Sequence, residues 1–262
     1  MKRDRQSQIK QLFLQKKRLT IRELCETYGI SAETARRDLN ALEADGFIRR
    51  NYGGGVLVDP ENEQDLMPPW DARFTAHLPE KRAIAREMLR RIPDHSIIAL
   101  DSGTSIFELA RLLREKNDLT ILTNDLRIAA ELSANTDHTL YYIGGVLKKD
   151  DMITTGFLTT DFLEHFSQID LTLLSADGFD INIGLTDYSV EMGTLKRAMI
   201  QKSRQVIVGV DASKFSVNAF YKVCGLDRLT TVITDSGAPA ESVRALESAG
   251  IQTVLVDHET TF

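Results

Sequence analysis

The 262-residue sequence has few of the residues on which disulfide-rich and metal-binding proteins depend. Its two cysteines, Cys25 and Cys224, lie far apart, and we interpret both as buried free thiols in a reducing compartment. The five histidines show no spacing typical of metal ligands, and none pairs with a cysteine. The sequence therefore predicts no disulfide, no metal site and no bound cofactor.

Long apolar segments are absent as well. No apolar run approaches the roughly 18 residues that a membrane-spanning helix needs. The start of the chain, MKRDRQSQIK, is charged and is not followed by an apolar stretch, unlike a secretory signal. Neither a G-x-G-x-x-G run nor a P-loop occurs, which argues against a nucleotide-binding module. We therefore expect a cytoplasmic protein without a membrane partner.

The charges are distributed unevenly along the chain. The formal net charge is −6, which by itself argues against binding to nucleic acid. However, residues 1–58 hold 12 Lys and Arg against 7 Asp and Glu, whereas residues 59–262 hold 20 against 31. A proline-containing and acidic segment, residues 59–78, is typical of a linker. We predict a basic domain over residues 1–58 that binds a polyanion and an acidic domain over residues 79–262.

The basic domain has the pattern of three helices. The first helix is expected over residues 5–15. Thr20 and Glu23 form a capping-box signature at the start of the second, and Gly29 is placed to end it. Ser31 is suited to cap a third helix, whose apolar face would carry Ala35, Leu39 and Leu42. Two helices joined by so short a turn predict a helix-turn-helix, in which the second helix enters the major groove of DNA.

A hairpin is expected after the third helix, with strands over residues 47–50 and 56–58 around a glycine-rich tip at residues 53–55. Such a wing would place Arg49 and Arg50 beside backbone phosphates. Arginine can also bond a guanine edge bidentately, but the sequence leaves open whether Arg36 or Arg37 does so. We interpret Asp38 as holding an arginine in place or capping the fold, and not as contacting DNA. The candidate DNA-binding residues are Thr20, Ser31, Glu33, Thr34, Arg36, Arg37, Arg49, Arg50, Tyr52, Gly53 and Gly54.

These residues carry a family resemblance. Residues 5–58 resemble the DNA-binding domain of DeoR-type bacterial transcription regulators. The family's recognition run is filled in order by Ser31, Thr34, Ala35, Arg36, Arg37, Asp38 and Leu39. Tyr52 stands where the family commonly has histidine, so this position departs from the pattern. The resemblance implies a winged helix-turn-helix that binds a double-stranded DNA operator.

From residue 80 onward, short apolar runs alternate with amphipathic helical patterns. Seven runs are expected as strands, namely SIIAL, LTIL, TLYYI, LTLLSA, QVIVGV, TVITDSG and IQTVLVD. Buried strands that are each followed by a helix predict an α/β fold with a mostly parallel sheet.

Hydroxyls, acids and glycines follow these strands. Because the functional sites of such sheets lie at the carboxyl ends of the strands, we expect an anion site at DSGTS with Lys214 as a cation for a phosphate. Each aspartate at these ends could instead be a helix cap. The candidate effector-binding residues are Asp101, Ser102, Gly103, Thr104, Ser105, Asn124, Asp125, Gly144, Gly145, Asp177, Asp211 and Lys214.

The runs DSGTS, TND, SADGFD, KRAMI and DASKF resemble the effector domain of the same family. That domain is similar in turn to ribose-5-phosphate isomerase. The resemblance implies a non-enzymatic repressor of a carbohydrate operon, acting as a homodimer or homotetramer, whose effector is a phosphorylated sugar. The alternative is a sugar-phosphate isomerase, for which Asp177, Asp187, Glu191 and Lys196 would be candidate catalytic groups.

Overall fold

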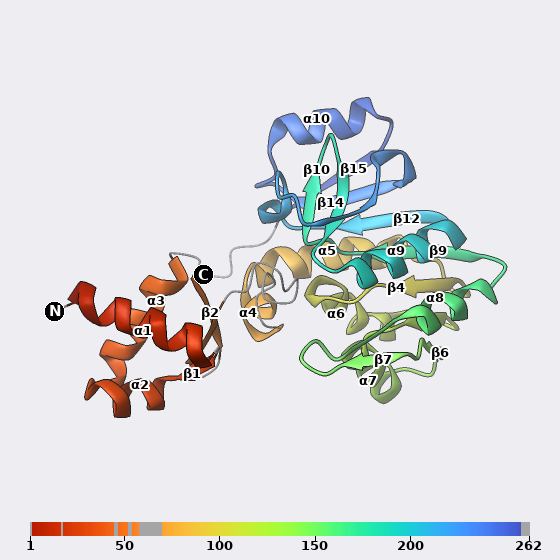
Figure 1. Cartoon of the computed structure of the whole chain (residues 1–262). Helices are drawn as coiled ribbons and strands as arrows, with labels where there is room; N and C mark the ends of the chain where they lie inside the picture. The colour runs from red at the N-terminus through yellow and green to blue at the C-terminus, as the bar shows by residue number, and fades with distance from the viewer. Residues whose placement is uncertain (1, 17, 45–46, 52–53, 58–69, 258–262) are drawn as a thin grey trace. The chain divides into compact units, whose positions relative to one another are not determined.

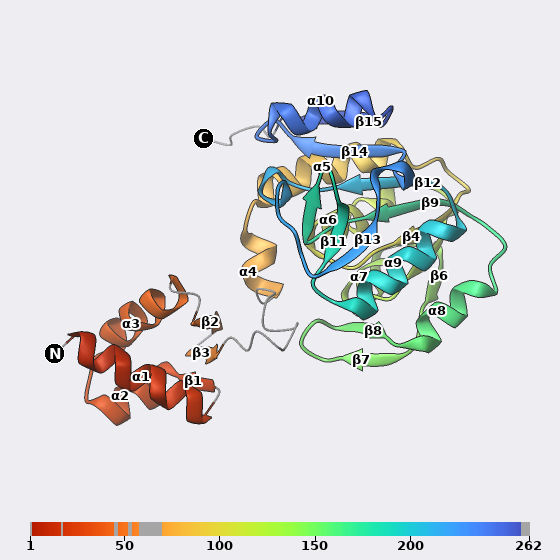
Figure 2. The same cartoon turned by 45° about the horizontal axis from the view of Figure 1, so that its top comes forward.

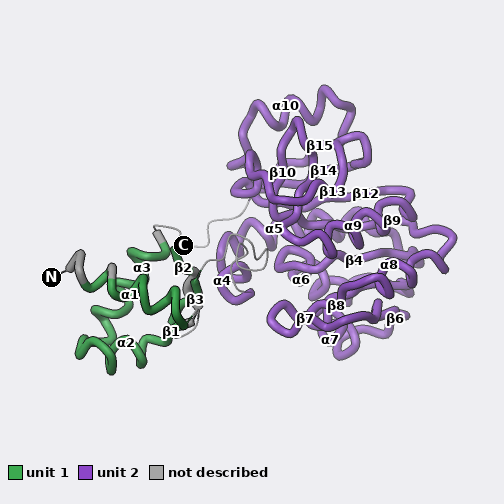
Figure 3. Tube along the Cα trace, viewed as in Figure 1, with its two compact units in different colours: residues 1–69 green, residues 70–262 purple. Residues whose placement is uncertain are grey.

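The computed structural model describes residues 2–16, 18–44, 47–51, 54–57 and 70–257 (Figure 1). The chain separates into two compact units, residues 1–69 and residues 70–262 (Figure 3). None of the described helices combines the length and the apolarity needed to cross a membrane.

The first unit has the predicted helix-turn-helix and hairpin. Its helices are α1 (Lys2–Lys16), α2 (Ile21–Tyr28) and α3 (Ala32–Ala44), and its strands are β1 (Arg18–Thr20), β2 (Ile48–Asn51) and β3 (Gly54–Leu57). Thr20 and Glu23 form the expected capping box, and Gly29 ends α2 with a φ of 62°. The order β1-β3-β2 makes a small antiparallel sheet, of which the sequence did not predict β1.

The core of this unit lies between its three helices and the sheet. Ile9, Phe13, Leu24 and Leu39 are fully buried within it. Gly54 is required where β3 pairs with β1, because a Cβ atom there would lie 2.1 Å from the backbone oxygen of Leu19. The helices and the hairpin therefore form the winged arrangement that the pattern predicts.

The second unit is built on a seven-stranded sheet in the order β15-β14-β12-β9-β4-β5-β6, and every neighbouring pair is parallel. The strands are β4 (Ile97–Leu100), β5 (Thr120–Thr123), β6 (Thr139–Tyr142), β9 (Ile169–Leu174), β12 (Ser203–Gly209), β14 (Thr231–Asp235) and β15 (Gln252–Val256). Each coincides with one of the seven apolar runs, so the predicted fold class is confirmed.

Helices cover both faces of the sheet (Figure 2). On one face lie α5 (Leu78–Arg90), α6 (Thr104–Ala110) and α7 (Leu126–Asn135), which share a core with alternate residues of the strands. On the other face lie α8 (Phe157–Glu164), α9 (Val190–Lys202) and α10 (Ala240–Ser248). Alternation along β12 shows the two layers: Val206 and Val208 pack in one core, and Ile207 packs in the other.

Short elements that the sequence did not predict complete the second unit. They are α4 (Trp70–Thr75), the hairpin β7 (Val146–Lys148) and β8 (Ile153–Thr155), and an antiparallel sheet of β10 (Gly178–Asp180), β11 (Gly184–Asp187) and β13 (Tyr221–Cys224). Part of the predicted linker, residues 70–78, thus belongs to this unit. Trp70 and Phe74 pack against Phe107 of α6, with ring centroids 5.8 and 5.9 Å from that ring.

Both cysteines are free thiols, as predicted. Cys224 is buried, and burial raises the pKa of its thiol to about 11. Cys25 is only partly buried, which differs from the expectation because its place on α2 is at the rim of the small core.

Candidate functional site

The outer face of α3 presents the candidate DNA-binding residues. The hydroxyl of Ser31 accepts a hydrogen bond from the backbone N–H of Thr34 at 3.2 Å, so Ser31 caps the helix as expected. Arg36 and Arg37 are both exposed. Arg36 lies 3.8 Å from the carboxylate of Glu33, whereas Arg37 makes no ion pair with any residue that the structure describes. This face can therefore offer two guanidinium groups to a polyanion.

Asp38 is buried on the opposite side of α3. Its carboxylate accepts hydrogen bonds from Arg5 Nε at 2.6 Å and from Arg5 Nη2 at 3.1 Å, which ties α1 to α3. The interpretation that Asp38 holds an arginine is thereby confirmed. Thr20 is likewise engaged within the protein, because its hydrogen bonds to Glu23 close the capping box and lower the pKa of Glu23.

The wing carries the remaining candidates. Arg49 and Arg50 lie on β2, where they pair with Val56 and Gly55 of β3. Gly54 is buried where β3 pairs with β1, so close packing explains why a glycine stands at this position. Tyr52 and Gly53 fall outside the described residues.

In the second unit, the strand order has a switch point between β4 and β9. The chain proceeds from β4 toward β5 and β6 on one side, and from β9 toward β12 and β14 on the other. Ligands of open α/β sheets bind at such a switch point, beyond the carboxyl ends of the strands. Two predicted runs meet there, since Asp101 Oδ2 accepts hydrogen bonds from Ser175 N–H at 3.0 Å and from Ser175 Oγ at 3.2 Å. A Cβ atom on Gly103, whose φ is 121°, would lie 2.8 Å from Ser175 Oγ.

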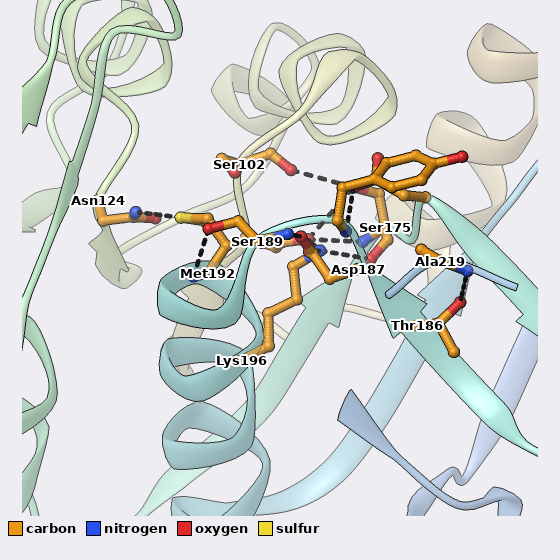
Figure 4. A network of polar contacts seen from close by, with 12 residues as sticks. Ser102, Asn124, Ser175, Thr186, Asp187, Ser189, Met192, Lys196 and Ala219 are labelled. Atoms are coloured by element: carbon orange, nitrogen blue, oxygen red, sulfur yellow. Dashed lines mark hydrogen bonds and ion pairs between the residues drawn. The ribbon is translucent and has the colours of Figure 1, made fainter. Parts of the chain in front are cut away.

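A buried lysine, Lys196, lies beside the carboxyl ends of β4 and β9 (Figure 4). Lys196, in the middle of α9, lies 2.8 Å from Asp187 Oδ2 and 3.1 Å from Asp101 Oδ2, and it donates to the backbone oxygen of Ser175 at 3.1 Å. All three residues of this ion cluster are almost fully buried. The three contacts account for the three protons of the ammonium group.

The charges in the cluster shift one another's pKa values. Burial alone would lower the pKa of Lys196, but the carboxylates of Asp101, Asp187 and Asp177 raise it above its ordinary value. Burial and the neighbouring Asp187 raise the pKa of Asp177 to about 6. Burial also raises the pKa of Asp101. Together with Asp177, the ion cluster holds three carboxyl groups against one ammonium, so it is negatively charged when all of them are ionised.

Three buried acceptor atoms near these loops have no hydrogen-bond partner among the described residues. They are Oδ1 of Asp101, Oδ1 of Asn124 and Oδ2 of Asp125. The other side of each side chain is held in place: Asn124 Nδ2 donates to Thr154 O at 2.8 Å, and Asp125 Oδ1 accepts from Arg127 N–H at 2.8 Å. Burial raises the pKa of Asp125 to about 6. Because an unpaired buried acceptor is costly, these atoms are suited to a ligand that donates hydrogen bonds.

Charged side chains of the second unit also act on Lys81. Burial lowers the pKa of Lys81 to about 8; Asp211 opposes this shift, and Lys214 and Arg73 lower the pKa further. Lys81 donates to the backbone oxygen of Ala76 at 2.6 Å, and Arg73 forms an ion pair with Asp151 at 3.2 Å. The positive charge of Arg73 also opposes the rise in the pKa of Asp177.

The other predicted effector-binding residues differ in their surroundings. Thr104 and Ser105 are buried at the start of α6, whereas Ser102 is partly exposed. Asp211 caps a short 3₁₀ turn by accepting from Ser213 N–H at 3.1 Å, so the helix-cap alternative holds for it. Gly144 and Gly145 are exposed in the connection from β6 to β7. Glu191 is half-exposed and pairs with Lys148, unlike the other three residues named for an isomerase.

Sequence patterns did not single out Lys81 or Arg73, and they placed Lys196 only in the isomerase alternative. Lys81 lies in the first turn of α5 and Lys196 in the middle of α9, and a lysine on a helix ordinarily faces solvent. The one available signal is that Lys81 falls among the apolar positions Ala83, Ile84 and Ala85.

Comparison with known proteins also divides the chain into an N-terminal and a C-terminal domain. Residues 5–61 match the model of the DeoR-like helix-turn-helix domain, and residues 76–236 match that of the DeoR C terminal sensor domain. The chain is 31% identical to a putative aga operon transcriptional repressor of Escherichia coli O157:H7, over 97% of this chain and 93% of that protein. It is 32% identical to the glycerol-3-phosphate regulon repressor of Escherichia coli K12, over 95% and 96% respectively.

Among solved structures, a D-ribose-5-phosphate isomerase in complex with phospho-erythronic acid matches 52% of this chain and 52% of its own, with 20% identity and a TM-score of 0.40. That likeness is too distant to bear on activity. The two domain matches and the relatives that span nearly the whole chain do bear on identity: the protein belongs to the DeoR family, with a DeoR-like helix-turn-helix domain and a DeoR C-terminal sensor domain in one chain.

Proposed function

We propose that this protein is a cytoplasmic repressor of a carbohydrate catabolism operon, and that a phosphorylated sugar lowers its affinity for the operator. The observation that carries the proposal is that Asp101, Asn124 and Asp125, which follow neighbouring strands of the parallel sheet, each have a buried acceptor atom without a partner among the described residues. The names of the two repressors described above support the choice of regulator over enzyme.

The chemistry of this candidate site matches a sugar phosphate. Hydroxyl groups of a sugar would donate to Asp101 Oδ1, Asn124 Oδ1 and Asp125 Oδ2, which are otherwise unsatisfied. A phosphate would lie between the DSGTS loop and the side chains of Lys214 and Lys81. An anion needs such cations here, because residues 59–262 are acidic overall.

The first unit would bind the operator through α3 and the wing. Arg36 and Arg37 are placed for bases or phosphates in the major groove, and Arg49 and Arg50 for phosphates beside it. We expect the protein to act as a homodimer or homotetramer, because one module of this size rarely supplies enough affinity for a specific site.

The isomerase alternative is less well supported. Lys196 is held by two carboxylates and a backbone oxygen, so it has no proton donor left for a substrate. Glu191 is half-exposed and paired with Lys148, so it does not join the acidic cluster.

A thermal-shift screen of phosphorylated sugars against the purified protein tests the proposal. We expect one sugar phosphate to raise the melting temperature of the wild type and to shift that of Lys214→Ala much less. Lys222→Ala, which removes an exposed lysine from β13, is the matched control. A turnover assay with the same compound separates the two alternatives, because conversion of the compound would indicate an isomerase.

A further inference from the structure

We propose that two copies of this chain associate through a surface formed by residues 139–147 and 152–160, here called the uncharged surface. The two segments read TLYYIGGVL and MITTGFLTT. Neither contains a charged residue, although charged residues make up 27% of the chain and flank both segments at Lys148, Asp151 and Asp161. Ile143, Ile153, Thr154, Thr155 and Thr159 are buried, so the exposed apolar part of the two segments consists of Tyr141, Val146, Leu147, Phe157 and Leu158.

The fold brings the two segments together. Val146 pairs with Thr155 across the β7–β8 hairpin, and a Cβ atom on Gly156 would lie 3.9 Å from the Val146 side chain. Phe157 and Leu158 follow directly as the first turn of α8. Both views show β7, β8 and α8 side by side (Figures 1 and 2). The exposed apolar side chains of the hairpin and of the first turn of α8 therefore lie on adjacent elements, and we call them the patch.

The patch is exposed to a degree that single apolar side chains seldom reach. Phe157 is 77% exposed and Val146 69%, and Leu158 is 52% exposed. Tyr141 of β6, at 42%, extends the patch toward the edge of the main sheet, where it packs edge-on against Phe166 beyond α8. Apolar exposure of this kind on adjacent elements marks a protein–protein contact.

Two strand edges border the patch. β6 ends the main sheet on one side, and β7 pairs only with β8 among the described strands. Edge strands are usually protected by lysine or proline; β7 ends in Lys148, whereas β6 contains neither residue. The unprotected edge of β6 is suited to pairing with a second copy about a two-fold axis.

Charge selects a second copy over other occupants. A basic partner, including the DNA-binding unit of the same chain, would find no carboxylate on this surface to pair with. Two acidic sensor units, in contrast, repel each other unless they meet where neither carries charge. The uncharged surface offers such a place, and a self-complementary contact needs no second patch.

The inference rests on the proposed function only for the expectation that operator binding uses more than one copy. Its test is the molar mass of the full-length chain, measured by sedimentation and light scattering over a range of concentrations. We expect Phe157→Glu and Val146→Glu to raise the dissociation constant of the dimer at least tenfold. Leu255→Glu, which changes a 51% exposed leucine on the opposite edge strand β15, should keep the wild-type mass.

Melting temperature and the shift that the sugar phosphate produces are measured on the same samples, and both should stay close to the wild type. Wild-type mass in both glutamate variants would overturn the inference, and so would dissociation by Leu255→Glu alone. A monomeric wild type whose DNA-binding unit becomes protease-sensitive in Phe157→Glu would show that this unit covers the patch, and would also overturn it. None of these results touches effector binding, so the proposed function would stand or fall separately.

Discussion

The two units of this chain hold their functional side chains in opposite environments. Arg36 on α3 is 55% exposed, and Arg37 beside it is exposed as well. In the sensor unit, Asn124 and Asp125 are fully buried, and Asp101 nearly so. The candidate DNA-binding arginines thus lie outside the core of the first unit, whereas the candidate effector-binding groups lie within the core of the second.

This difference determines what each ligand does to the protein. DNA contacts made by exposed arginines leave the packing of α3 unchanged. A ligand that satisfies buried acceptors, in contrast, changes the free energy of the sensor unit itself, because those groups are costly while they remain unpaired. Changes to the two sets of residues should therefore separate cleanly into effects on affinity and effects on stability.

The largest effect is expected for Lys196→Met. The substitution leaves Asp101 and Asp187 without their shared cation in a buried site, which typically costs about 3–5 kcal/mol. Thermal unfolding of the sensor unit should shift down by roughly 10 °C. Lys202→Met, on the same helix, removes a surface ion pair with Glu164 and should shift it by little. Equal melting temperatures in the two variants would show that the buried cluster does not hold the fold.

A smaller effect, on affinity alone, is expected for the recognition helix. Arg36→Ala and Arg37→Ala should weaken operator binding, and at least one should relax base preference by about 1–3 kcal/mol. Arg49→Ala and Arg50→Ala should weaken binding similarly on all sequences and flatten its salt dependence. Fluorescence anisotropy with operator and scrambled DNA measures both. Arg90→Ala, an exposed arginine of the sensor unit, is the control. Unchanged operator binding in all four variants would contradict the proposal that α3 and the wing bind DNA.

The smallest effect is a dependence on pH that differs in sign between the units. The pKa of Asp125 is raised to about 6, above its unfolded value of about 3.9, so the folded sensor unit binds more protons between these values. Its stability should fall by about 1 kcal/mol as the pH rises from about 5 to 7. In the DNA-binding unit, the pKa of Glu23 is lowered, so its contribution is lost as the pH falls instead.

Chemical denaturation followed separately in each unit would measure these slopes. Asp125→Asn should reduce the slope of the sensor unit, which Asp177, with a pKa also raised to about 6, would still sustain in part. A sensor unit that gains stability between pH 5 and 7 would contradict the raised pKa that burial gives to Asp125.

The comparison of the units also shows where sequence patterns are informative. The helix-turn-helix was predictable because Thr20, Gly29 and Ser31 mark helix ends through local chemistry. The seven parallel strands were predictable because each contains a short apolar run. The hairpin β7–β8 and the small antiparallel sheet were not, because their strands are only three or four residues long and depend on distant partners.

The residues of the candidate site also differ in whether the sequence could predict their positions. Asp101, Asn124 and Asp125 could be placed together because they follow neighbouring strands of the parallel sheet. Lys81 and Lys196 could not be placed with them, because whether a helical lysine is buried depends on which face of its helix packs on the sheet. The roles of all these residues in binding remain predictions.

The central claim is that occupancy of the candidate effector site lowers operator affinity, and one measurement tests it most directly. Operator affinity is determined with and without the sugar phosphate found by thermal shift, for the wild type, Lys214→Ala and Lys222→Ala. The account predicts a loss of roughly 5- to 150-fold for the wild type and for Lys222→Ala, as is usual for coupled sites. Lys214→Ala should bind the operator normally and lose the response. A Lys214→Ala protein that responds at wild-type effector concentrations, or an effector that strengthens operator binding, would contradict it.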